Sequence, residues 1–145
     1  MHPTGSAAIV IVLLASATLT TFGPASAQAA DTQTVKDIMT QQVVPASDTI
    51  WGASELATDA EWKPVGDAAR VLVKAGESLS GGGASEVEQA WIAQPEWQAF
   101  NQQMIDAARQ ILIAVEQRDE EALFNIGNDA LYPPCAGCHE RYMPK

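Results

Sequence analysis

Apolar residues beyond about residue 30 recur at steps of three and four and do not alternate with polar ones. This spacing places apolar side chains on one stripe of an α-helix, whereas alternation would indicate β-strands. The pattern predicts helices from Thr34 to about Leu56, from Thr58 to about Ser80, from Pro95 to about Val115, and from Asp119 onward. Four amphipathic helices joined by mostly short links close most simply as an antiparallel four-helix bundle. The expected fold is therefore all-α.

Polar residues mark where several of these helices begin. Thr58 and Glu61 have the spacing of a capping box, in which each residue satisfies a backbone N–H of the other. Ser85 and Glu88 repeat this spacing inside the connection from about 80 to 94, which predicts a short helix there. Asp119 is suited to cap the last helix.

The first helix is expected to bend at Pro45. A proline inside a helix removes one hydrogen bond and clashes with the preceding turn. The apolar stripe expected on this helix consists of Val35, Ile38, Met39, Gln42, Ala46, Thr49, Ile50 and Ala53.

The first 30 residues contain no Asp, Glu, Lys or Arg. An apolar run at 7–15 is followed by small and polar residues ending in Ala25-Ser26-Ala27, which is typical of a cleaved secretory signal. An uncleaved membrane anchor is the alternative, but the run is shorter than the roughly 20 apolar residues of a transmembrane helix. The sequence predicts a cleaved Sec-type signal peptide at 1–27, one domain at 28–145, and a periplasmic protein without stable membrane insertion.

The chain has 18 acidic and 8 basic side chains, a formal net charge of −10. This charge disfavours nucleic acid and anionic membranes as partners. It is compatible with docking on a basic patch of another protein, although it also serves solubility. The charge does not decide whether the chain forms a homodimer. We find no phosphate-binding glycine loop, no Ser, His and Asp set and no recognisable carboxylate pair, so the chain is not expected to be an enzyme.

Both cysteines and the only histidine outside the expected signal peptide lie within five residues, as Cys135, Cys138 and His139. The order Cys-x-x-Cys-His is the attachment motif of c-type haem, in which both thiols form thioethers and the histidine binds the iron. A disulfide, a thioredoxin-like redox pair and a zinc site are the alternatives. The disulfide would close a very small loop, the redox pair would need a preceding strand, and zinc lacks a fourth Cys or His ligand.

With this motif near the carboxyl end of a small helical domain, the chain resembles the class II c-type cytochromes, which include cytochrome c prime. The resemblance implies one covalently attached haem c and periplasmic transfer of single electrons when the iron is six-coordinate. It implies binding of NO or CO when the distal side of the iron is open. Pro133 and Pro134 depart from the family, whose last helix usually continues into the motif, so we expect a break or restart with Pro134 in a new first turn.

The distal ligand decides between these two functions. Met143 lies only four residues after His139, too close to reach around the porphyrin to the iron. The resemblance points to Met39 on the first helix, with Met104 in reserve, although a methionine on an apolar stripe is commonly core filling. The expected site is therefore Cys135, Cys138, His139 and Met39, with His139 and Met39 as iron ligands, and the expected function is electron transfer.

Three residues close to the motif in sequence are also candidates for the haem surroundings. Tyr132 and Tyr142 are expected near the ring because they flank its attachment point. Arg141 could pair with a haem propionate, whereas a solvated arginine is the more common outcome.

Overall fold

The structure is a computed structural model of the chain, and it describes residues 1, 33–81 and 83–143. Within these ranges the regular secondary structure is helical, without a strand, which confirms the all-α prediction. Apart from residue 1, the expected signal peptide at 1–27 lies outside the described residues. Among the helices that are described, none has the length and apolar character to cross a membrane.

The first predicted helix consists of three consecutive elements, α1 (Val35–Ile38), the π-helix η1 (Met39–Val43) and α2 (Val44–Trp51). Thr34 caps α1 by accepting a hydrogen bond from the backbone N–H of Asp37. The helix ends at Trp51 and not near Leu56 as predicted, because Gly52 forms its C-cap.

The π-turn accommodates Pro45 without ending the helix. The N–H of Val44 donates to the carbonyl of Met39, five residues back, which widens the turn just before the proline. A π-turn inserts about one extra residue, so it shifts the buried face along the sequence. Val43 is consequently buried, whereas Thr49, which we expected on the apolar stripe, is exposed.

The middle of the chain forms α3 (Asp59–Gly81), α4 (Glu86–Ile92) and α5 (Pro95–Gln117). The predicted capping box at Ser85 and Glu88 is present, with reciprocal backbone hydrogen bonds. Only half of the capping box predicted at Thr58 and Glu61 is present at the start of α3. The Glu61 carboxylate accepts hydrogen bonds from the backbone N–H and the hydroxyl of Thr58, whereas the Glu61 N–H donates to the Thr58 carbonyl and not to its hydroxyl.

The last predicted helix also has three consecutive elements, α6 (Glu120–Asn125), the π-helix η2 (Ile126–Leu131) and α7 (Tyr132–Tyr142). Asp119 caps α6, as predicted. The prolines at 133–134 lie in the first turn of α7, but no break separates α7 from the preceding helix. Here too a π-turn precedes the prolines, since the N–H of Tyr132 donates to the carbonyl of Gly127.

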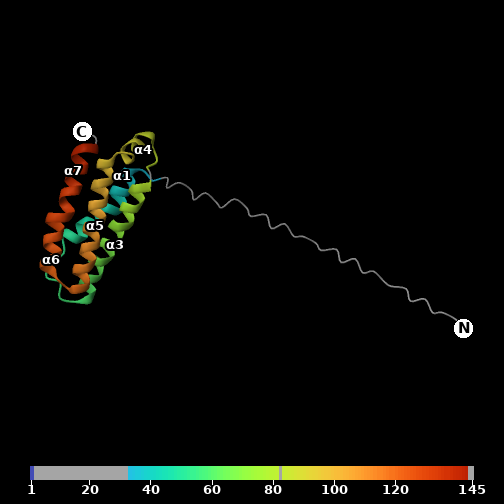
Figure 1. The fold of residues 1–145 in the computed structure, drawn as a ribbon. Coiled ribbons are helices and arrows are strands. Elements are labelled where there is room, and N and C mark those ends of the chain that lie inside the picture. Colours follow the sequence, from blue (N-terminus) through green and yellow to red (C-terminus); the bar gives the residue numbers. More distant parts are fainter. Residues whose placement is uncertain (2–32, 82, 144–145) are drawn as a thin grey trace.

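The long helices α3 and α5 lie side by side, with α2 packed on α3 and with η2 and α7 packed on α5 (Figure 1). Gly76 permits the close approach of α3 and α5, because a Cβ at this position would lie 2.4 Å from the Cγ1 of Ile105. The core between the helices includes the fully buried Ile38, Leu72 and Ile111. Each such side chain contributes roughly 1.5–3 kcal/mol by burial.

Candidate functional site

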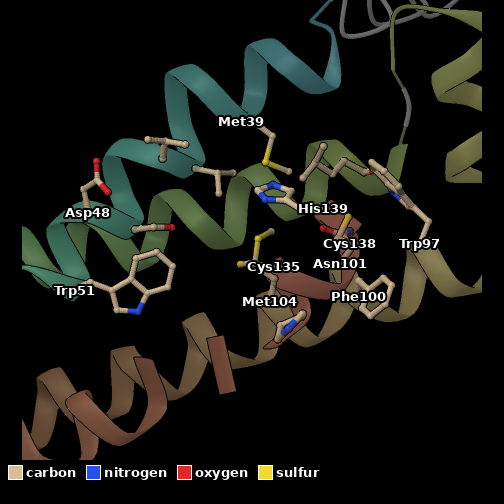
Figure 2. A pocket seen from close by; sticks show the side chains of 15 residues that line it. Met39, Asp48, Trp51, Trp97, Phe100, Asn101, Met104, Cys135, Cys138 and His139 are labelled. Carbon is tan, nitrogen blue, oxygen red and sulfur yellow. The ribbon is translucent and has the colours of Figure 1, made fainter. Parts of the chain in front are cut away.

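An apolar cavity of about 140 Å³ that opens to solvent lies among η1, α2, α5 and α7. Met39 lines it from η1 and Met104 from α5, while Cys135, Cys138 and His139 line it from α7. Figure 2 shows these labelled side chains gathered around the cavity from helices that are far apart in the sequence. The cavity therefore brings together the four residues predicted for the site, along with the reserve methionine.

The four predicted residues differ in their solvent exposure. Met39 is half-buried and packs against the core, and both cysteines are half-buried. His139 is exposed although it also lines the cavity, so its imidazole stands at the cavity mouth. Met143 is 59% exposed and does not line the cavity, in agreement with its exclusion as a ligand.

Burial determines the protonation of the two thiols. Burial raises the pKa of Cys135, and burial together with the neighbouring Cys135 sulfur raises the pKa of Cys138 to about 11. Both groups are therefore neutral at pH 7. Neutral sulfurs facing an apolar cavity suit a thioether to an apolar ring better than they suit a reactive thiolate.

The surroundings give little support to the three alternative uses of the cysteines. The two thiols are free, so no disulfide joins them. A thioredoxin-like pair needs a strand before the motif, and the described residues there are helical. Within the described parts of the chain, no three His, Cys, Asp or Glu side chains cluster as a zinc site requires.

Asn101 on α5 is a polar residue of the cavity wall that the sequence reasoning missed. Its Nδ2 donates to the carbonyl of Gly76 and to the hydroxyl of Ser80, which itself donates to that carbonyl. This arrangement fixes the amide orientation and leaves Oδ1 buried without a hydrogen-bond partner. An unsatisfied buried acceptor costs about 1–3 kcal/mol. Its only sequence signal is a polar residue four positions after Trp97, within an apolar stripe.

Of the three candidate residues close to the Cys-x-x-Cys-His motif, one packs beside the cavity and two lie at the surface. Tyr142 is buried and packs edge-on against Trp97, a cavity-lining residue, with 5.0 Å between ring centroids. Tyr132 is 59% exposed and lines a separate surface hollow, so its sequence position next to the motif does not bring it to the cavity. Arg141 forms a surface ion pair with Glu96 at 3.1 Å.

Comparisons of the chain with protein-family models, with curated proteins and with solved structures found no match.

Proposed function

We propose that this chain is an exported monohaem c-type cytochrome of the class II kind, an antiparallel four-helix bundle that carries single electrons. The observation that carries the proposal is one apolar cavity lined jointly by Met39, Cys135, Cys138 and His139. Its lining is predominantly apolar and includes two thiols and one imidazole, the donor set of a c-type haem. The residues present therefore fit a haem group.

In this proposal Cys135 and Cys138 would hold haem c through two thioethers, and His139 and Met39 would bind its iron. A bound haem c supplies a one-electron iron couple. The chain supplies the surroundings: the apolar lining excludes water, and methionine and histidine ligation raises the reduction potential. No side chain is required to act on a substrate.

Met39 is the preferred distal ligand over Met104 for two reasons. The resemblance to class II cytochromes points to a methionine on the first helix. In addition, Met39 begins a π-turn, a distortion that is common at functional sites, whereas Met104 is 5% exposed within the core stripe of the regular helix α5. Met104 therefore serves as a matched control.

Spectra of the protein, produced in a host that matures c-type cytochromes, test the ligand set. We expect a low-spin ferric spectrum with a weak long-wavelength sulfur-to-iron band in the wild type. Met39→Ala should lose this band and bind carbon monoxide rapidly on reduction, whereas Met104→Ala should keep the band. A high-spin ferric wild type that takes up carbon monoxide at once would instead establish an open site and a gas-binding function.

Covalent attachment needs its own measurement. Acidic acetone should leave the colour on the wild-type polypeptide, and its mass should exceed that of its amino acids by one haem. A polypeptide with the mass of its amino acids alone, after maturation in a competent host, would contradict the whole proposal.

A further inference from the structure

A second hollow lies on the surface between α2 and the segment from α6 to the start of α7. Three exposed aromatic side chains line it: Trp51 is 44% exposed, Phe124 69% and Tyr132 59%. We call these three residues the aromatic face. Exposing large aromatic side chains together is unfavourable in water, and clustered apolar exposure is typical of interaction sites.

Trp51 connects the aromatic face with the candidate haem cavity. It lines both the surface hollow and the cavity, and Figure 2 shows it beside the cavity on the same helix as Asp48. Its indole Nε1 donates to the carbonyl of Gly127 at 3.1 Å, which holds the ring between α2 and η2. A protein bound at the aromatic face would therefore contact a fixed side chain that also lines the cavity.

The charged residues in the two stretches that form the aromatic face are predominantly acidic. The chain has no Lys or Arg between Lys36 and Lys63, or between Arg118 and Arg141, and these two stretches supply every residue that lines the hollow. Arg118, at the edge of the second stretch, is paired with Asp59. The acidic residues on α2, α6 and η2 and on the turn before α6 are Asp48, Asp119, Glu120, Glu121 and Asp129.

We propose that the aromatic face is the docking surface for a redox partner protein that has an apolar centre surrounded by Lys and Arg. This inference rests on the proposed function. The charge pattern favours such a partner over a second copy of this chain, because a second copy would bring the same acidic residues together. Opposite charges accelerate encounter at low salt, where rate constants reach about 10⁸–10⁹ M⁻¹s⁻¹ against about 10⁵–10⁶ M⁻¹s⁻¹ without steering. A short-lived complex of this kind suits electron transfer.

Stopped-flow electron exchange with a strongly basic mitochondrial cytochrome c tests the docking surface. One electron passes from the ferrous haem of this protein to the ferric haem of the probe, and no bond or proton is exchanged. We expect the second-order rate constant to fall about tenfold or more between low and physiological salt. Phe124→Ser should lower the low-salt rate about fivefold or more, while Ile113→Ser, at a 52% exposed position on α5, should leave it unchanged.

A charge reversal separates steering at the aromatic face from the effect of net charge. Asp129→Lys on η2 and Glu77→Lys on α3 change the net charge equally, but only the first lies on an element that forms the hollow. The proposal expects Asp129→Lys to lower the low-salt rate several-fold more than Glu77→Lys. Equal effects of the two reversals, or equal effects of Phe124→Ser and Ile113→Ser, would overturn it.

Two further measurements distinguish the remaining outcomes. Sedimentation that reveals a dimer lost in Phe124→Ser would make a second copy the occupant and overturn the inference. An absorption spectrum recorded first keeps the two proposals apart. A chain without haem contradicts the proposed function and removes the basis for docking. A haem-loaded chain whose electron-exchange rate does not change with substitutions at the aromatic face contradicts the docking inference alone.

Discussion

Gly137, inside the Cys-x-x-Cys-His motif, lies directly against the ring of Phe100 on α5. A Cβ at position 137 would lie 2.7 Å from Cε1 and 2.8 Å from Cζ of that ring, closer than real Cβ contacts. Phe100 itself lines the cavity, so it cannot withdraw without changing the cavity wall. We therefore expect Gly137→Ala to destabilise the protein by about 1–3 kcal/mol, measured by thermal unfolding.

Gly81, the last residue of α3, provides the control for this substitution. A Cβ there would meet nothing within 4 Å, so Gly81→Ala should leave the unfolding temperature unchanged or slightly raised. Equal unfolding temperatures for the two variants would refute the steric role of Gly137.

At the scale of single residues, the sequence located the candidate site better than it predicted the surroundings of that site. Cys135, Cys138 and His139 could be singled out because their order matches a known covalent chemistry. Tyr132 was misplaced because adjacency in sequence says little about direction on a helix, where neighbouring side chains are about 100° apart. Asn101 was missed because its unsatisfied acceptor exists only through contacts with Gly76 and Ser80 on another helix.

At the scale of helical elements, the start of α3 depends on the ionised form of Glu61. Hydrogen bonds from the Thr58 hydroxyl, the Thr58 N–H and the Ala57 N–H lower the pKa of this carboxyl below its ordinary value of 4.5. A carboxyl with a lowered pKa in the folded state stabilises the protein above its unfolded pKa, and this stabilisation is lost as the pH falls through the folded pKa.

Replacing Glu61 with Gln should therefore lower the unfolding temperature at neutral pH by more than it does in acid. The difference from the wild type should be full above about pH 5 and should shrink as the pH falls below 4.5. Thermal unfolding followed by circular dichroism across this range is the measurement. Glu77→Gln, at an exposed position near the C-terminal end of the same helix, controls for the loss of one negative charge. A pH-independent effect of Glu61→Gln would contradict the capping role.

The helical elements themselves were largely predictable, whereas the two π-turns were not. The capping signals at Ser85 and Asp119 are local, so the sequence contains nearly all the information that fixes them. A π-turn depends on how a proline is accommodated within a packed helix, and the spacing of apolar residues does not show this. Missing the π-turn before Pro45 assigned Thr49 to the buried face and left Val43 out.

At the scale of the whole molecule, the candidate haem cavity occupies space where a helical protein normally has packed side chains. Leaving about 140 Å³ of apolar cavity empty would cost about 3 kcal/mol, at about 24 cal/mol per Å³. Whole domains are stable by only about 5–15 kcal/mol. The all-α fold was predictable because helical periodicity is a property of each segment. The cavity was not, because it arises from the way in which η1, α5 and α7 are packed.

Because the cost of an empty cavity is a large part of a domain's stability, we expect the helices to pack in a fixed arrangement only when the cavity is filled. Cys135→Ser combined with Cys138→Ser, purified free of haem, should keep its far-ultraviolet helical signal, because the capped helices form through local interactions. It should lose near-ultraviolet signals from residues such as Trp97 and bind a hydrophobic dye. Met39→Ala is the control, since it retains the proposed thioethers and should keep the near-ultraviolet signals. A haem-free double variant that unfolds as cooperatively as the wild type, with unchanged near-ultraviolet signals, would mean that the helices pack without any occupant of the cavity.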